Sequence, residues 1–236
     1  GIGSSCGSGA EADDQGIEGG SGAGTAKTLG FKLEGRWSAF RRSWPFSFFK
    51  KSAIITAMRV VSGNYGGRPL RTLDGKITRP TSDKVRGAIF NMIGPYFEGG
   101  RVLDLFAGSG GLSIEAVSRG MESAVLVERD RKAQAIIREN ISMTKEADKF
   151  QLLAMEANQA LGQLTGTFDV VFLDPPYAKE EIMDNIQQLC QRKLLAEDVM
   201  VVCETDKAVD LPEEIADLGI WKQKVYGISK VTVYVR

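Results

Sequence analysis

Residues 103–112 read Leu-Asp-Leu-Phe-Ala-Gly-Ser-Gly-Gly-Leu, an apolar strand that runs into a glycine-rich turn and then into the start of a helix. Gly108 and Gly110 have no side chain, so a ligand can lie against the backbone at the amino end of that helix. A tight strand-to-helix turn without a ligand is the alternative interpretation. The next strand ends in Glu128, where an acid can accept hydrogen bonds from the hydroxyls of a ribose. The pattern therefore favours a nucleotide-type cofactor at this turn.

The sequence around this turn predicts an α/β fold. Apolar strand candidates at 101–106, 124–128, 150–155, 168–174 and 199–204 alternate with helical stretches near 110–119, 130–144, 157–164, 179–192 and 212–217. Such alternation is typical of a parallel sheet with helices on both faces. Residues 221–226 and 230–236 have no helix between them, so a closing hairpin would add an antiparallel strand. We expect a mostly parallel, seven-stranded sheet with an antiparallel C-terminal hairpin.

A second motif follows the fourth of these strands. Residues 168–177 read Phe-Asp-Val-Val-Phe-Leu-Asp-Pro-Pro-Tyr. The two prolines fix φ at about −65° and lack N–H groups, so the backbone around Asp174 is rigid and its carbonyls are free to accept hydrogen bonds. This strand end lies on the same sheet edge as the glycine turn, where open α/β sheets bind ligands. The motif favours chemistry on a planar amino group, although it could also simply end a strand.

The amino-acid composition excludes several classes of protein. The chain has 236 residues, 43% of them hydrophobic and 25% charged, which suits a globular domain with one core. Its three cysteines are widely separated and it has no histidine, so no zinc pattern and no His-dependent catalysis is expected. No apolar run reaches the roughly 20 residues of a membrane span. We expect a cytoplasmic protein without a metal or a membrane partner.

The chain divides into three segments. Glycine and serine dominate the first 24 residues, which cannot bury enough surface to fold. We interpret residues 1–57 as disordered or as an extension added to the natural chain; a targeting segment is the alternative, which their acids oppose. Residues 58–98 predict a hairpin and a capped helix through Ile93. Residues 99–236 carry the sheet.

The second segment is strongly basic. Between Met58 and Asn91, two acids accompany seven cations: Arg59, Arg68, Arg71, Lys76, Arg79, Lys84 and Arg86. On a chain with a formal net charge of zero, this excess suggests a localised anionic partner. A solvated charged surface is the alternative interpretation.

Together these motifs resemble those of class I S-adenosylmethionine-dependent methyltransferases. Residues 104–110 match the cofactor loop, and residues 174–177 match the motif of enzymes that methylate exocyclic amino groups of bases. The basic segment further resembles the amino-terminal signature of the RsmD-type 16S ribosomal RNA guanine-N2 methyltransferases, in Arg59-Val60-Val61-Ser62-Gly63, Gly67-Arg68, Arg79-Pro80-Thr81-Ser82-Asp83-Lys84-Val85-Arg86 and Phe90-Asn91. The resemblance covers residues 58–236 and implies a Rossmann-like class I methyltransferase domain from a bacterial protein.

The resemblance also implies roles for individual residues. Asp174 and the Pro175 carbonyl would accept the N–H bonds of a guanine amino group, and Tyr177 would stack on the base. S-adenosyl-L-methionine would lie against Asp104, Phe106, Ala107, Gly108, Gly110, Glu128, Arg129, Glu156, Ala157 and Asp174. The phosphates of 16S rRNA, or of a small-subunit assembly intermediate, would contact Arg59, Arg68, Arg79, Lys84 and Arg86. We expect a monomer.

Three alternatives stay open at this stage. The same Asp-Pro-Pro-Tyr chemistry serves N6-adenine and N4-cytosine methyltransferases that act on DNA or RNA. A non-catalytic RNA-binding assembly factor could retain the fold. A dinucleotide-binding oxidoreductase would share the glycine turn and the acid at the next strand end.

Overall fold

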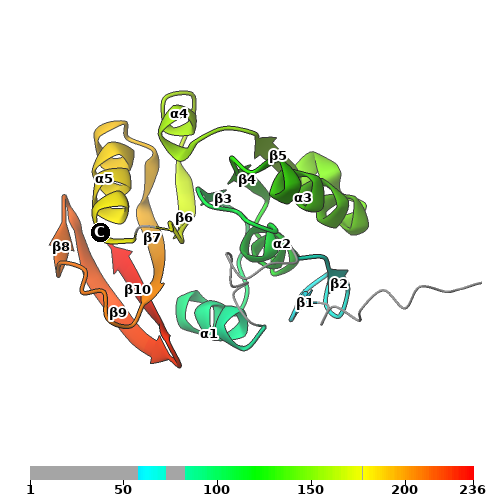
Figure 1. The fold of residues 1–236 in the computed structure, drawn as a ribbon, viewed down its shortest axis with the longest axis horizontal. Helices are drawn as coiled ribbons and strands as arrows, with labels where there is room; N and C mark the ends of the chain where they lie inside the picture. Colours follow the sequence, from blue (N-terminus) through cyan, green and yellow to red (C-terminus); the bar gives the residue numbers. More distant parts are fainter. Residues whose placement is uncertain (1–57, 73–82, 177) are drawn as a thin grey trace, which may run out of the picture. The chain divides into compact units, whose positions relative to one another are not determined.

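The structure is a computed structural model that describes residues 58–72, 83–176 and 178–236. Figure 1 shows these residues and labels their helices and strands. The expectations for residues 1–57, for Arg79 and the predicted caps Thr81 and Ser82, and for Tyr177 lie outside the described residues.

A mixed sheet forms the centre of residues 99–236, in the strand order β5-β4-β3-β6-β7-β10-β9-β8. The parallel strands are β3 (Arg101–Asp104), β4 (Ser123–Val127), β5 (Phe150–Leu153), β6 (Phe168–Leu173) and β7 (Leu195–Asp206). The antiparallel strands are β8 (Glu214–Ile215), β9 (Leu218–Tyr226) and β10 (Ser229–Val235). The strand order reverses between β3 and β6, and open α/β sheets bind their ligands at the carboxyl ends of the strands beside such a switch point. The predicted mostly parallel sheet with an antiparallel C-terminal hairpin is confirmed.

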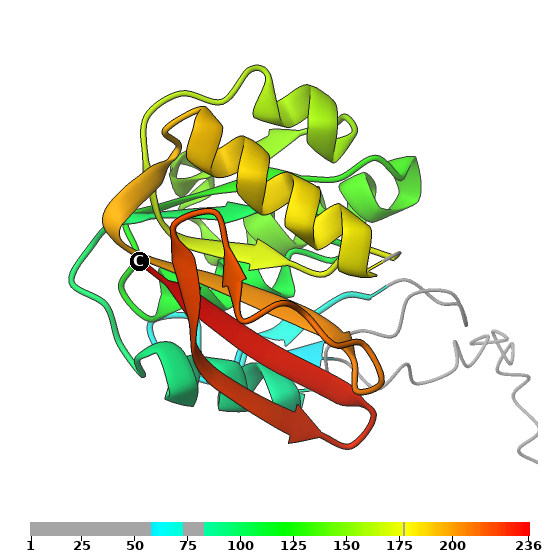
Figure 2. The same cartoon turned by 90° about the vertical axis from the view of Figure 1, so that its left-hand side faces the viewer.

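Helices cover both faces of the sheet. One hydrophobic core includes side chains of α1 (Asp83–Ile93), α2 (Gly111–Ser118) and α3 (Arg131–Thr144). The other includes side chains of α4 (Ala157–Leu161) and α5 (Ala178–Gln191). Because successive strand residues point to opposite faces, Phe172 packs into the first core and Leu173 into the second. Figure 2 shows α5 and α1 on opposite sides of the C-terminal strands.

The helix predicted near residues 212–217 is wrong. Glu214 and Ile215 form β8, which pairs with β9 and adds an eighth strand to the sheet. Ala216 adopts a left-handed backbone with φ of 55°, which turns the chain directly into β9. Ile215 is buried in the core beneath α5, so the hairpin buries the apolar side chain that made a helix plausible. The helix predicted at 157–164 forms but ends earlier, at Leu161.

The predicted hairpin is present at the start of the described chain. Strand β1 (Met58–Arg59) pairs antiparallel with β2 (Pro69–Leu70). Val60 and Leu70 of this segment belong to the same core as Phe90 of α1. The boundary placed at residue 99 stays a prediction. None of the helices in the described ranges is long and apolar enough to span a lipid bilayer.

Candidate active site

The glycine loop after β3 forms an open corner at the sheet edge. Gly108 and Gly110 both have a left-handed backbone, with φ of 54° and 78°. A Cβ atom added at Gly110 would lie 3.1 Å from Cδ2 of Leu126, whereas one added at Gly108 would meet no atom within 4 Å. Packing against Leu126 and the left-handed backbone therefore both favour glycine at position 110. Gly108 borders free space in which a ligand can approach the backbone.

Glu128, at the end of β4, is tied to this loop. Its Oε2 accepts a hydrogen bond of 2.8 Å from the Gly108 backbone N–H, and its Oε1 accepts one of 2.8 Å from Asp130 N–H. The residue is half-buried. Each carboxylate oxygen has two lone pairs, so both keep one acceptor site. The geometry suits a carboxylate that binds a pair of hydroxyls beside the loop.

Asp104 is a buried carboxyl at the end of β3. Its Oδ2 accepts a 3.0 Å hydrogen bond from the hydroxyl of Ser113, a buried residue of α2 that our sequence predictions did not include. Burial raises the pKa of Asp104 to about 7, and hydrogen bonds from Ser113 and the Phe106 backbone oppose this shift. The side chain of Phe106 packs against the core beneath α4 and α5.

Asp174 follows β6 directly, next to β3 in the sheet. Asp104 pairs in register with Phe172, two residues before Asp174. Surrounding protein atoms raise the pKa of Asp174 to about 8, and the carboxylates of Glu204 and Asp104 raise it further. The residue is nevertheless exposed to solvent, so water limits this shift, whereas the following Pro175 is buried.

The three acids define the electrostatics of this edge. Glu204 and Asp104 each act on Asp174 as a like charge, so this part of the site favours a positively charged ligand over an anion. Among the described residues, no group of three or more His, Cys, Asp or Glu side chains is arranged to hold a metal ion.

Three other residues predicted to contact the cofactor follow β4 and β5, the strands on the far side of β3. Nη1 of Arg129, after β4, lies 3.4 Å from Oε2 of Glu156, after β5, and both side chains are exposed. Ala157 is buried at the first position of α4. The structure therefore brings Arg129 and Glu156 together; an exposed ion pair of this kind contributes little stability.

The residues predicted to contact RNA differ in exposure. Arg59 and Lys84 are exposed. Arg68 is half-buried, and its Nη1 donates to the carbonyls of Met143 and Thr144, at 2.9 and 3.1 Å, at the end of α3. Arg68 thus has a structural role in addition to any contact with a phosphate.

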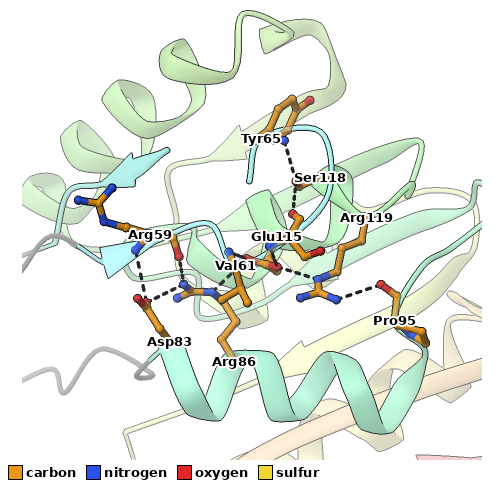
Figure 3. A network of polar contacts seen from close by, with 10 residues as sticks. Arg59, Val61, Tyr65, Asp83, Arg86, Pro95, Glu115, Ser118 and Arg119 are labelled. Atoms are coloured by element: carbon orange, nitrogen blue, oxygen red, sulfur yellow. Dashed lines mark hydrogen bonds and ion pairs between the residues drawn. The ribbon is translucent and has the colours of Figure 1, made fainter. Parts of the chain in front are cut away.

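The prediction that Arg86 contacts RNA is wrong. Its side chain is fully buried, and Figure 3 shows the polar contacts that surround it. Nη2 donates to Oδ1 of Asp83 at 2.8 Å and to the carbonyl of Arg59, and Nε lies 3.4 Å from Oε2 of Glu115. Arg86 therefore joins α1 to the hairpin and to α2. A phosphate could reach it only if these elements separated.

Glu115 is the centre of this network, and our sequence analysis did not identify it. Its carboxylate accepts hydrogen bonds from the backbone N–H groups of Val61 and Ser62, at 2.6 and 2.9 Å, and from Nε of Arg119 at 2.7 Å (Figure 3). The side chain is completely buried. Glu115 is the one charged residue of α2, whose other residues are apolar or small. This isolated acid was the signal in the sequence, because an acid buried in such a helix requires polar partners.

The strand order, the glycine loop after β3, the acid after β4 and Asp-Pro-Pro after β6 together define a class I methyltransferase fold. A solved structure of a provisionally named methyltransferase, yhhF, from Escherichia coli is similar to this chain. The TM-score is 0.69 at 31% identity, over 76% of this chain and 98% of that one.

The model of the family described as "Conserved hypothetical protein 95" matches residues 58–235, and the chain belongs to this family. A Bacillus subtilis relative, provisionally named rRNA methyltransferase YlbH, is 44% identical over 75% of this chain and 98% of its own length. Ribosomal RNA small subunit methyltransferase D of Escherichia coli K12 is 31% identical over 76% of this chain and 90% of its own length. The resemblance to RsmD-type enzymes is confirmed.

Proposed function

We propose that this protein transfers a methyl group from S-adenosyl-L-methionine to the exocyclic N2 amino group of a guanine in 16S ribosomal RNA. The observation that carries the proposal is that Asp174 and Pro175 follow β6 two residues beyond the Asp104–Phe172 pair, at the sheet edge where the glycine loop follows β3. The names of the relatives support ribosomal RNA of the small subunit as the substrate. The choice of guanine rests on the family resemblance.

The residues at the edge fit this cofactor. Gly108 borders open space, and Glu128 keeps one acceptor site on each oxygen for the ribose hydroxyls. The Asp104 carboxyl can accept hydrogen bonds from an ammonium group. Phe106, Ala107 and Gly110 shape the loop, while Arg129, Glu156 and Ala157 would border the adenine. When bound, S-adenosylmethionine supplies an activated methyl group on a positively charged sulfonium, a charge that the surrounding acids favour.

The amino nitrogen of guanine is a poor nucleophile because its lone pair is delocalised into the ring. In our proposal the Asp174 carboxylate and the Pro175 carbonyl each accept one N–H bond, which favours a pyramidal nitrogen with its lone pair directed at the methyl group. Tyr177 stacks on the base and orients it. As the nitrogen gains its methyl group it becomes positive, and Asp174 takes the released proton directly or through water.

The exposed Arg59 and Lys84, together with Arg79, would contact RNA phosphates and position the substrate. Arg68 would add a contact with the part of its side chain that remains exposed. The amino group of a paired guanine is engaged within the helix, so we expect the target to be an unpaired or flipped nucleotide.

One experiment tests this function. Unmodified small-subunit RNA, free and as ribonucleoprotein, is incubated with labelled S-adenosylmethionine and digested to nucleosides. We expect N2-methylguanosine from wild type and none from Asp174→Ala, which should still bind the cofactor. Label on adenine or cytosine would replace the guanine assignment. No transfer with any substrate would favour a non-catalytic assembly factor.

A further inference from the structure

Residues of α1 and β9 line an open groove on the face of the sheet that α1 covers; Figure 2 shows these two elements. Its volume is about 510 Å³, and it is lined by Ala88, Asn91, Met92, Lys222, Gln223, Lys224 and Tyr226. We call it the α1–β9 groove. None of these lining residues is acidic, and two carry a positive charge. Its chemistry is therefore opposite to that of the acidic edge at Asp174.

Strand register places this groove close to the candidate active site. Leu173 of β6 pairs with Cys203 of β7, Cys203 with Thr232 of β10, and Thr232 with Gln223 of β9. Strands β6 and β9 run in the same direction, so Asp174 and Lys224 each lie one residue beyond this row. Three strand spacings amount to about 14 Å. The groove thus opens a short distance along the edge from Asp174.

The two lysines combine charge with aromatic surface. Nζ of Lys222 donates to the Met92 carbonyl at 3.2 Å and lies 3.6 Å from the ring centroid of Trp221. Nζ of Lys224 lies 5.6 Å from the ring centroid of Tyr226. An ammonium group has three donors, so each lysine can still bind an anion. Lysines interleaved with aromatic rings form the kind of surface that binds single-stranded nucleic acid.

The groove lies on the same side of α1 as one exposed lysine, Lys84. Lys84, Ala88 and Asn91 follow one another at helical spacing, so they share one side of α1. Lys84 is exposed, and Ala88 and Asn91 line the groove. A nucleic acid held by the amino-terminal hairpin could therefore extend along α1 to β9.

Charge complementarity explains why the RNA backbone would use this groove. Glu204, together with Asp104 and Asp174 in their ionised forms, repels phosphates, yet the target base has to reach this edge. The phosphates on either side of that base therefore need cationic contacts beside the acidic edge. Lys222 and Lys224 supply such contacts within the reach of a short RNA segment.

We propose that the α1–β9 groove binds the backbone of the substrate RNA next to the target nucleotide. Lys222 and Lys224 contact its phosphates, and Tyr226 offers a ring to a neighbouring base. This inference rests on the proposed function, because it names a second contact region for the same RNA.

The double variant Lys222→Gln/Lys224→Gln tests the proposal. Its matched control is Arg192→Gln/Lys193→Gln, which removes two exposed charges at the end of α5, on the opposite edge of the sheet. Binding of unmodified small-subunit RNA is measured over a series of salt concentrations. We expect the groove variant to lose about tenfold in affinity and its salt slope to fall by about 1.4 to 1.8. The control should match wild type.

Three further results make the test decisive. Lys222→Arg/Lys224→Arg keeps the charges and should restore the salt slope, and cofactor binding by the Gln variant should equal that of wild type. An unchanged salt slope in the Gln variant overturns the proposal. A loss seen with ribonucleoprotein but not with free RNA also overturns it, since the groove would then contact a ribosomal protein. Failure of the proposed function would instead appear as absent methyl transfer by wild type.

Discussion

The backbone N–H of Gly108 donates a 2.8 Å hydrogen bond to Oε2 of Glu128. This bond joins the loop after β3 to the end of β4, while Oε1 of the same carboxylate accepts from Asp130 N–H at the start of α3. The protein itself therefore orients the acid that we assign to the ribose. A preorganised acceptor loses little freedom on binding, which favours affinity.

Replacing Glu128 with Ala should weaken cofactor binding and lower stability together. Loss of hydrogen bonds to a charged acceptor is worth about 1.5–3 kcal/mol, so we expect the dissociation constant to rise about ten- to hundredfold in calorimetry. Asp130→Ala is the control, because Asp130 caps α3 through Lys132 N–H and Ala133 N–H. It should lose about 1 kcal/mol of stability but bind the cofactor normally. Equal weakening in both variants would remove the ribose role.

Two glycine substitutions separate packing from binding. At Gly110, an added Cβ would press on Leu126, 3.1 Å away, with φ already at 78°. We therefore expect Gly110→Ala to lose about 1–3 kcal/mol in chemical unfolding. At Gly108 the added methyl group meets no protein atom within 4 Å. Gly108→Ala should lose about 1 kcal/mol or less from its left-handed backbone, yet weaken cofactor affinity strongly. Normal affinity in that variant would place the cofactor elsewhere.

The apolar strand pattern was enough to predict the sheet edge. Asp104 ends a buried strand, Glu128 and Asp174 each follow one, and parallel strands bring their carboxyl ends to one side. The same reasoning failed at residues 212–217. Leu211, Ile215 and Leu218 recur at helical spacing, but their burial is achieved by a hairpin that pairs with β9. The pairing of β8 with β9 selects the hairpin over a helix, and the spacing of apolar residues in the sequence does not reveal this pairing.

The sequence does not show which cations of the basic segment lie on the surface and which are buried. Arg86 and Lys84 are two residues apart on α1, yet one is buried and the other exposed. The difference arises from Glu115, which lies 29 residues further along the chain than Arg86. A buried arginine needs such a partner, and only the fold shows which acid supplies it.

Loss of the Arg86 side chain should therefore reduce stability and leave the RNA salt slope unchanged. Arg86→Ala leaves the buried Glu115 with one cation fewer, and breaking a buried pair typically loses about 3–5 kcal/mol. Arg59→Ala, at an exposed position, should unfold like wild type but reduce the salt slope of RNA binding by about 0.7 to 0.9. A fall in the slope for a folded Arg86→Ala would show that this residue contacts phosphate after all.

Asp104 should make stability depend on pH. Folding raises the pKa of this carboxyl from 3.8 to about 7, mainly through burial, so between these values the folded protein binds more protons than the unfolded chain. The free energy of unfolding should therefore fall as pH rises from about 4 to about 7 and then level off. Asp104→Asn keeps an acceptor for Ser113 and should flatten this slope. Urea unfolding across that range measures it, and an unchanged slope in the variant would contradict the assignment.

Asp174 should make methylation depend on pH in the opposite direction. Surrounding protein atoms, and then the carboxylates of Glu204 and Asp104, raise its pKa to about 8, which is an upper limit because the residue is exposed to water. A protonated carboxyl cannot take the proton released from the amino nitrogen, so kcat/KM should rise with pH and level off above about 8. The positive sulfonium of the bound cofactor favours the ionised form of Asp174 and so lowers its pKa. Because kcat reports the enzyme–substrate complex, its inflection should lie at lower pH than that of kcat/KM.

Two variants identify the group behind this inflection. Asp174→Asn cannot ionise, so its residual rate should be independent of pH and at least about a hundredfold lower. Glu204→Gln removes a neighbouring negative charge, which should lower the pKa of Asp174 and move the inflection to lower pH. Single-turnover methyl transfer from about pH 6 to about pH 9 measures all three proteins. If wild type shows no inflection, or Asp174→Asn retains it, another group accepts the proton.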